Sequence, residues 1–321
     1  MPALTYCGTV YQAAPGESVL EALLRQGVGI SNSCRAGACQ SCLLRATGGG
    51  IPPVAQQGLK ATLVEQGYFL ACVCRPKADL LLEPAGGLEV EATITALERL
   101  SPTVMRARVR TKTPLEYRAG QYITLRRNDG LTRSYSLASL PEDGALELHI
   151  RRAPHGRMSG WLFDEAREND AVRVRGPAGD CFYTAGKPEQ PLLLAATGTG
   201  LAPLVGICRD AVKQGHHGPI HLYHGASRPE GLYLQAELSA ITKAHGNVHY
   251  KPVVLAGGES AGVASGALDK VIAADHPRLN GWRGFVCGDP SIVKTLKKKW
   301  FMAGMESREI FADAFVEAPH T

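Results

Sequence analysis

The spacing of apolar residues changes twice along this chain. The first part mixes short alternating segments with a helical pattern, the second alternates through many short segments, and the third contains continuous apolar runs. Alternation with a period of two predicts half-buried strands, whereas short continuous apolar runs predict strands buried on both faces. We therefore expect a multidomain protein whose three domains cover residues 1–86, 87–186 and 187–321.

The first part predicts a small fold that mixes helices and strands. Residues 3–13 alternate and place Gly8 near the turn of a hairpin. Ser18 and Glu21 have the spacing of a capping box, which predicts an amphipathic helix that closes at Gly27. The pattern then predicts a strand over 42–46, a polar helix near 57–66, a strand over 68–73 and a linker at 83–87.

The second and third parts predict a barrel and a parallel sheet. Many short alternating strands separated by turn residues are typical of an antiparallel β-barrel. Apolar runs that alternate with helical stretches are typical of an α/β domain with a parallel sheet. The expected barrel strands cover 91–97, 104–109, 122–126, 133–138, 146–151 and 171–175. The expected parallel strands cover 192–196, 220–224, 249–255 and 284–287, with helices from about 201 to 214 and near 234–244, 266–274 and 290–301.

Composition narrows the class of protein. The 321 residues are 45% hydrophobic and 20% charged with a net charge of +5, and they contain no basic stripe with interleaved aromatic residues, so we expect no nucleic-acid partner. No apolar run approaches the roughly 20 residues that cross a bilayer, and the N-terminus lacks the pattern of a signal peptide. Nine cysteines in such a chain predict a reducing compartment and metal or redox chemistry. We expect a cytoplasmic monomer without membrane contact.

Four cysteines have the spacing of an iron–sulfur site. Cys34, Cys39 and Cys42 form C-x4-C-x2-C, and Cys72 follows after 29 intervening residues. The stretch resembles the cluster loop of plant-type ferredoxins, in which four thiolates hold a [2Fe–2S] cluster. The resemblance implies a β-grasp ferredoxin domain with these four cysteines as ligands. Cys74 competes with Cys72 for the fourth place.

Other readings of the cysteines fit less well. Structural zinc sites favour two C-x2-C-like pairs on separate knuckles, and disulfides do not suit a chain without a secretion signal. Gln40 occupies a position where the ferredoxin family usually has glycine. We expect the remaining cysteines outside the motifs, Cys7, Cys181 and Cys208, to be packing residues.

Two motifs in the barrel point to a flavin. The first is Arg133-Ser-Tyr-Ser-Leu137, and the second is Gly156-Arg-Met-Ser159 at the start of a helix. An arginine can fork onto a pyrophosphate, and a helix N-terminus presents free N–H groups to phosphate. Both resemble the flavin motifs of the ferredoxin–NADP⁺ reductase superfamily. The resemblance implies that FAD binds at Arg133, Tyr135, Ser136, Leu137, Ile150, Gly156, Met158 and Ser159.

The third part carries two motifs of the same superfamily. Thr197-Gly198-Thr199-Gly200 and Pro203 follow a buried strand, where glycines let a backbone approach a dinucleotide. Cys287-Gly288-Asp289 lies at the end of the last predicted strand, and Phe315 lies near the C-terminus. The resemblance implies that all these residues contact the nicotinamide cofactor or the flavin, with Ser136 and Cys287 on either side of the hydride path.

Together the three parts resemble the reductase components of ring-hydroxylating dioxygenases and related oxygenases. A nicotinamide delivers two electrons at once and a [2Fe–2S] cluster accepts one, while a flavin exchanges them singly or in pairs. The resemblance implies electron transfer from NADH through FAD to the cluster and on to an oxygenase. Other acceptors remain open: a P450, a hybrid-cluster protein or a deoxysugar dehydrase. Two other functions also remain open for the whole protein: a stand-alone diaphorase and a non-redox binding module with a zinc site. NADPH is a further alternative, because Arg228 suits a 2′-phosphate and Glu230 a 2′-hydroxyl.

Overall fold

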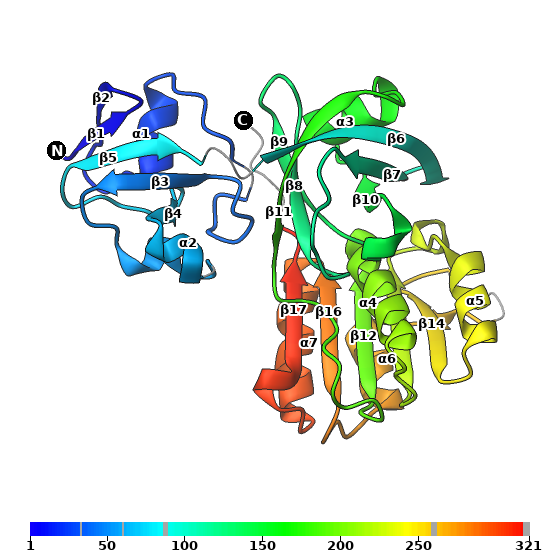
Figure 1. The fold of residues 1–321 in the computed structure, drawn as a ribbon. Helices are drawn as coiled ribbons and strands as arrows, with labels where there is room; N and C mark the ends of the chain where they lie inside the picture. The colour runs from blue at the N-terminus through cyan, green and yellow to red at the C-terminus, as the bar shows by residue number, and fades with distance from the viewer. Residues whose placement is uncertain (33, 60, 86–88, 258–261, 317–321) are drawn as a thin grey trace.

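The computed structural model describes residues 1–32, 34–59, 61–85, 89–257 and 262–316. Within these residues the strands form three separate sheets that follow one another along the chain. Figure 1 shows the first sheet beside the second, with the second above the third. The predicted linker at 83–87 falls partly outside the described residues. In the part of the chain that the structure describes, no helix is long and apolar enough to span a membrane.

The first sheet is small and mixed. Its strand order is β2-β1-β5-β3-β4, with β1 parallel to β5 and the other pairs antiparallel. The predicted capping box is present, because Ser18 N–H donates to Glu21 Oε2 at 2.8 Å and Glu21 N–H donates to Ser18 Oγ at 3.2 Å. The elements are β1 Ala3–Tyr6, β2 Thr9–Gln12, α1 Val19–Arg25, β3 Leu43–Gly48, α2 Ala61–Glu65, β4 Tyr68–Leu70 and β5 Leu80–Pro84.

Three sequence expectations for this part were inaccurate. The strand expected over 68–73 ends at Leu70, so Cys72 lies in the turn that follows it. The helix expected near 57–66 spans only α2, and Pro53–Gln56 forms a separate 3₁₀ turn before it. Cys7 is exposed in the β1–β2 turn, so a packing role for it was wrong. Cys181 and Cys208 are buried, as expected.

The second sheet is antiparallel and curls into a barrel. Its order is β10-β7-β6-β11-β8-β9, and a bridge between Leu137 and Leu148 joins the two edges. Alternate apolar side chains such as Ile94, Ile123 and Leu148 are fully buried inside it. The elements are β6 Glu89–Ser101, β7 Val104–Thr111, β8 Tyr122–Arg126, β9 Thr132–Ser136, β10 Leu146–Arg151, α3 Arg157–Asp164 and β11 Ala171–Ala178.

The third sheet is parallel, with the order β15-β14-β13-β12-β16-β17. Alternate residues of its central strand enter two different cores. Leu192 and Leu194 pack with α4 and α5, whereas Leu193 packs with α6 and α7 on the other face. The elements are β12 Leu192–Thr197, α4 Leu201–Lys213, β13 Ile220–Ala226, α5 Gln235–Ala244, β14 Val248–Val254, β15 Ala264–Ser265, α6 Leu268–Asp275, β16 Arg283–Gly288, α7 Pro290–Met302 and β17 Ile310–Ala314.

A buried arginine fastens the barrel to the parallel-sheet domain. Arg106 of β7 is 6% exposed and contacts three carboxylates, at 2.9 Å from Glu98, 3.3 Å from Glu147 and 2.6 Å from Glu237. Glu237 belongs to α5, so this charge lies between two domains. A buried guanidinium is tolerated only when carboxylates compensate for the water it loses. The network therefore holds the two domains in one orientation.

Candidate functional site

The four predicted cluster cysteines form two pairs. Cys39 N–H donates to the Sγ of Cys34 at 3.3 Å, and Cys34 N–H donates to the Sγ of Cys39 at 3.4 Å. Cys72 N–H donates to the Sγ of Cys42 at 3.4 Å. Among the described residues, no three or more His, Cys, Asp or Glu side chains form a site for one metal ion. Two pairs of thiols suit a dinuclear cluster, which needs two thiolates for each iron.

The neighbouring Cys74 has a different environment. Its side chain is fully buried in the hydrophobic core of the first domain, and this burial raises the pKa of its thiol to about 12. By contrast, the N–H of Cys72 donates to the Sγ of Cys42, so Cys72 lies directly beside another candidate ligand. The structure thus places Cys72 with the other candidate ligands and Cys74 away from them.

The cluster loop contains left-handed backbone at three positions. Gly37 has φ 76°, and Arg35 and Gln40 have φ values of 53° and 55°. A Cβ at Gly37 would lie 3.2 Å from Val73, so a side chain there would crowd the turn that carries Cys72. Gln40 takes the conformation that glycine adopts most easily. Its departure from the ferredoxin pattern therefore leaves the path of the loop intact.

A cavity of about 710 Å³ lies where the three domains meet. One wall comes from the cluster loop, including Cys34, Arg35 and Cys39, and another comes from the parallel-sheet domain, including Thr199 and Phe315. The barrel contributes the predicted flavin residues Arg133, Tyr135, Ser136, Gly156, Met158 and Ser159. Its size and its mixture of arginine, aromatic and hydroxyl groups fit FAD.

Some predicted flavin and nicotinamide residues lie elsewhere. The side chains of Leu137 and Ile150 are buried in the barrel core and do not line the cavity. Pro203 is buried in the first turn of α4, where the missing proline N–H leaves no hydrogen bond unmade. Contact between these residues and a cofactor stays a prediction.

A carboxylate that the sequence did not single out reaches Ser136. The hydroxyl of Ser136 donates to Oδ2 of Asp313 at 2.8 Å. Asp313 lies on β17 and lines the same cavity, and burial raises the pKa of its carboxyl. The two residues are 177 positions apart, so local sequence patterns carry no signal for this contact.

Gly156 permits a tight turn at the start of α3. A Cβ at this position would lie 2.3 Å from Ser159 Oγ and 2.9 Å from the Cβ of Ala153. The Ser159 hydroxyl accepts a hydrogen bond from Ala153 N–H at 3.1 Å and donates to Gly156 O at 3.2 Å. The first N–H groups of a helix have no partner within it and attract anions. This turn can therefore hold a phosphate group.

The two motifs of the parallel-sheet domain pack directly together. A Cβ at Gly200 would lie 2.2 Å from the carbonyl oxygen of Cys287, and one at Gly288 would lie 2.4 Å from Thr197 Oγ1. Asp289 N–H donates to Thr197 Oγ1 at 2.8 Å. The motifs meet at the carboxyl ends of β12 and β16, where open α/β sheets bind ligands.

Cys287, Asp289 and Phe315 each have a defined structural partner. The Sγ atoms of Cys287 and Cys181 are 3.6 Å apart, and burial raises the pKa of Cys287. The side chain of Asp289 caps α7 by accepting from Ser291 N–H at 2.8 Å. Phe315 N–H donates to Gly288 O at 2.8 Å, and Phe315 lines the large cavity.

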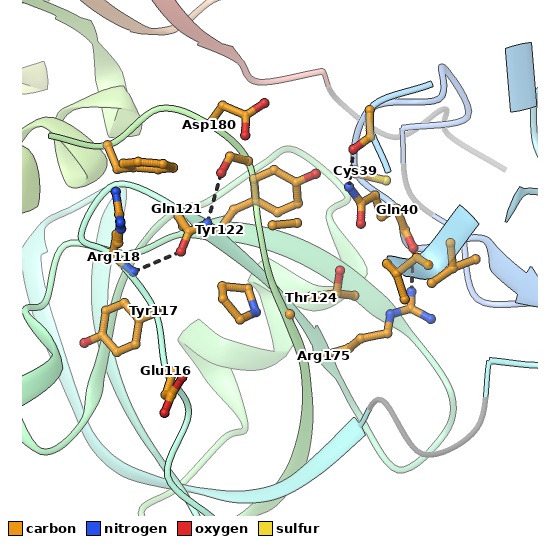
Figure 2. Close-up of a pocket in the computed structure, with 18 residues that line it drawn as sticks. Cys39, Gln40, Glu116, Tyr117, Arg118, Gln121, Tyr122, Thr124, Arg175 and Asp180 are labelled. Carbon is orange, nitrogen blue, oxygen red and sulfur yellow. Dashed lines mark hydrogen bonds between the residues drawn. The ribbon is translucent and has the colours of Figure 1, made fainter. Parts of the chain in front are cut away.

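A second cavity of about 580 Å³ lies between the cluster loop and the barrel. Figure 2 shows Cys39 and Gln40 facing Tyr122, Thr124 and Arg175 across it. Tyr122 of the barrel and Cys39 of the cluster loop line both cavities. These two residues therefore lie where the two cavities adjoin.

The chain matches three protein families in succession. Residues 5–77 match the 2Fe-2S iron-sulfur cluster binding domain, residues 91–183 the oxidoreductase FAD-binding domain and residues 194–298 the oxidoreductase NAD-binding domain. With the cavity and the cysteine pairs, these matches define an iron–sulfur flavoprotein oxidoreductase that uses a nicotinamide cofactor. The fold is a [2Fe–2S] ferredoxin domain followed by a flavin-binding barrel and a nicotinamide-binding α/β domain.

Similar proteins narrow the class to a family. The ferredoxin–NAD(P)⁺ reductase component of the naphthalene 1,2-dioxygenase system of Pseudomonas putida is 33% identical, over 94% of each chain. The reductase subunit of the aromatic O-demethylase of an Amycolatopsis species is 33% identical, over 98% of this chain and 99% of that one. The crystal structure of an Amycolatopsis cytochrome P450 reductase has a TM-score of 0.70 and 31% identity, and it covers 98% and 99% of the two chains. The chain belongs to the family of reductase components of oxygenase systems.

Proposed function

We propose that this protein takes electrons from NADH and passes them through FAD and a [2Fe–2S] cluster to the oxygenase component of a multicomponent system. The observation that carries the proposal is the composition of the large cavity. Its wall combines cluster-loop residues, flavin-motif residues and nicotinamide-domain residues, so a flavin held there touches all three domains. Bound FAD supplies the exchange between two-electron and one-electron chemistry.

The motif residues divide into groups that hold the flavin, the nicotinamide and the cluster. Arg133 and the turn at Gly156 and Ser159 hold the pyrophosphate, and Tyr135 packs against the flavin ring. Asp313 orients the hydroxyl of Ser136 toward the reacting face through their 2.8 Å hydrogen bond. Cys287 leaves room for the nicotinamide because its side chain is small. Cys34 with Cys39, and Cys42 with Cys72, each bind one iron.

We also propose the domain limits, the cellular location and the oligomeric state of the protein. We place the domain limits at residues 1–86, 87–186 and 187–321, and we propose a cytoplasmic monomer without a nucleic-acid or membrane partner. A cytochrome P450 is the second candidate acceptor, because a similar solved structure is that of a cytochrome P450 reductase.

Removal of the Ser136 hydroxyl tests the proposed hydride path. Ser136→Ala should slow flavin reduction by NADH by about two orders of magnitude, because small losses of positioning at a reacting centre cost that much. The rate is followed at the flavin band by anaerobic stopped-flow absorbance. FAD content and the cluster spectrum serve as controls and should stay at wild-type values. An unchanged rate at full FAD content would remove Ser136 from the hydride path.

A further inference from the structure

Three barrel side chains hold the cluster loop by its backbone. Tyr122 Oη donates to the carbonyl oxygen of Ala38 at 2.7 Å, and Ser134 Oγ donates to that of Cys39 at 3.3 Å. Arg175 Nη2 donates to the carbonyl oxygens of Gln40 and Ser41, at 2.8 and 2.5 Å. Four consecutive carbonyl groups of the loop, at positions 38–41, therefore accept hydrogen bonds from the barrel.

These bonds also orient the N–H groups of the loop. In a trans peptide the carbonyl and the following N–H point in opposite directions. The Ala38 carbonyl faces Tyr122 while the N–H of Cys39 donates to Cys34 Sγ. The Gln40 carbonyl accepts from Arg175, and the hydroxyl oxygen of the next residue, Ser41, lies 3.2 Å from Cys39 Sγ. At the Ala38–Cys39 peptide the barrel thus turns the N–H toward a ligand sulfur.

Arg175 adds a permanent charge to this arrangement. It lies half-buried on β11, beside the cluster loop (Figure 2). Its guanidinium contacts the carbonyl oxygens of Gln40 and Ser41, the two residues between Cys39 and Cys42. Glu89, the cross-strand neighbour of Arg175, is paired with Arg126 at 2.9 Å. An arginine stays protonated in a protein. The cluster loop therefore has a fixed positive charge on its barrel side.

We propose that Arg175 is a positioning residue for the iron–sulfur centre, which anchors the cluster loop to the barrel and makes the cluster easier to reduce. Reduction adds negative charge, which a neighbouring guanidinium stabilises. Net charge and hydrogen bonds to the sulfurs are among the factors that set cluster potentials. The inference rests on the proposed function, because it assumes that the four cysteines hold a cluster that the flavin reduces.

Two substitutions separate the charge from the anchor. Arg175→Gln removes the charge, and Arg175→Lys keeps the charge but replaces the planar fork with a single ammonium group. The matched control is Arg173→Gln, because Arg173 is exposed on the same strand two residues earlier. The cluster's midpoint potential is measured by redox titration followed by electron paramagnetic resonance. Hydrogen–deuterium exchange of peptides covering residues 34–42 reports on the anchor.

We expect Arg175→Gln to lower the midpoint potential and speed exchange in the loop, with the flavin reduction rate unchanged. Arg175→Lys should keep the potential closer to the wild-type value while exchange still rises, and Arg173→Gln should match wild type in both.

Should Arg175→Gln fail to fold, faster loop exchange in Arg175→Lys still supports the anchor, and wild-type exchange contradicts it. If NADH reduces the cluster but Arg175→Gln has the cluster potential and the loop exchange of the wild type, the role proposed for Arg175 is wrong. A wild-type cluster that NADH does not reduce would instead overturn the proposed function.

Discussion

Cys72 and Cys74 lie two positions apart in one turn, yet their thiols face different surroundings. Cys72 approaches Cys42, whereas Cys74 is enclosed in the core. We expect Cys72→Ser to lose the cluster and keep FAD, because a hydroxyl replaces one of four thiolate ligands. Cys74→Ser should keep both groups and lose some stability, because it buries a hydroxyl. Iron and flavin content of the two purified variants would decide this, and the reverse pattern would overturn the ligand assignment.

Two exposed residues after β13 are the candidates for choosing between NADH and NADPH. Arg228 precedes the turn that contains Glu230, and both are exposed. If Arg228 binds the 2′-phosphate, Arg228→Ala should lower kcat/KM for NADPH by about 10- to 100-fold, the worth of one hydrogen bond to a charged group. The value for NADH should stay within about twofold. Glu230→Ala is the opposite control and should weaken NADH use alone; an equal loss with both cofactors would show that Arg228 does not discriminate between them.

At the residue scale, motif chemistry carried most of the prediction. Arg133, Tyr135, Ser136 and Ser159 were predicted from local patterns, and all four line one cavity. Asp313 was not predicted, because its place in the site comes only from its contact with Ser136, which is far from it in the sequence. The contact of Arg175 with the cluster loop was not predicted either, since its partners are carbonyl groups of a different domain.

At the scale of elements, α3 offers a matched pair of glycines, with Gly156 at its N-cap and Gly160 inside the helix. Gly156→Ala would force its methyl group against Ala153 and Ser159, whereas a Cβ at Gly160 would meet nothing within 4 Å. We expect Gly156→Ala to weaken FAD binding at least about tenfold, because the phosphate turn must open. Gly160→Ala should keep FAD and raise stability by up to about 1 kcal/mol through helix propensity. Fluorescence titration of each apoprotein with FAD measures the affinity of the two variants, and thermal unfolding measures the stability of Gly160→Ala. Equal FAD affinities of Gly156→Ala and Gly160→Ala would contradict the role given to the turn.

The elements themselves were predictable where the pattern was local. The bounds expected for β8 and β10 match the structure, because both strands alternate between turn residues. β5 and β17 were not predicted. Each is five residues long and lies parallel to an earlier strand: β5 to β1, where Leu80 pairs with Leu4, and β17 to β16, where Ile310 pairs with Gly284. Such strands depend on tertiary pairing more than on their own pattern.

At the scale of the whole molecule, the order of the domains was evident from motifs, but their contacts were not. The Arg106 network joins the barrel to α5, and the carbonyl contacts join the barrel to the cluster loop. No periodicity predicts such bonds, since each depends on how two finished domains meet. They are among the contacts that join the three domains, and residues from all three domains line one cavity.

An anaerobic titration of the purified protein with NADH, followed by its visible spectrum, shows whether electrons from NADH reach both the flavin and the cluster. We expect the flavin bands and the broad iron–sulfur absorbance both to bleach, and complete bleaching to take more than one equivalent of NADH. Two electrons reduce the flavin and one more reduces the cluster. Bleaching of the flavin alone would contradict the account, because it would show that the cluster and the flavin do not exchange electrons.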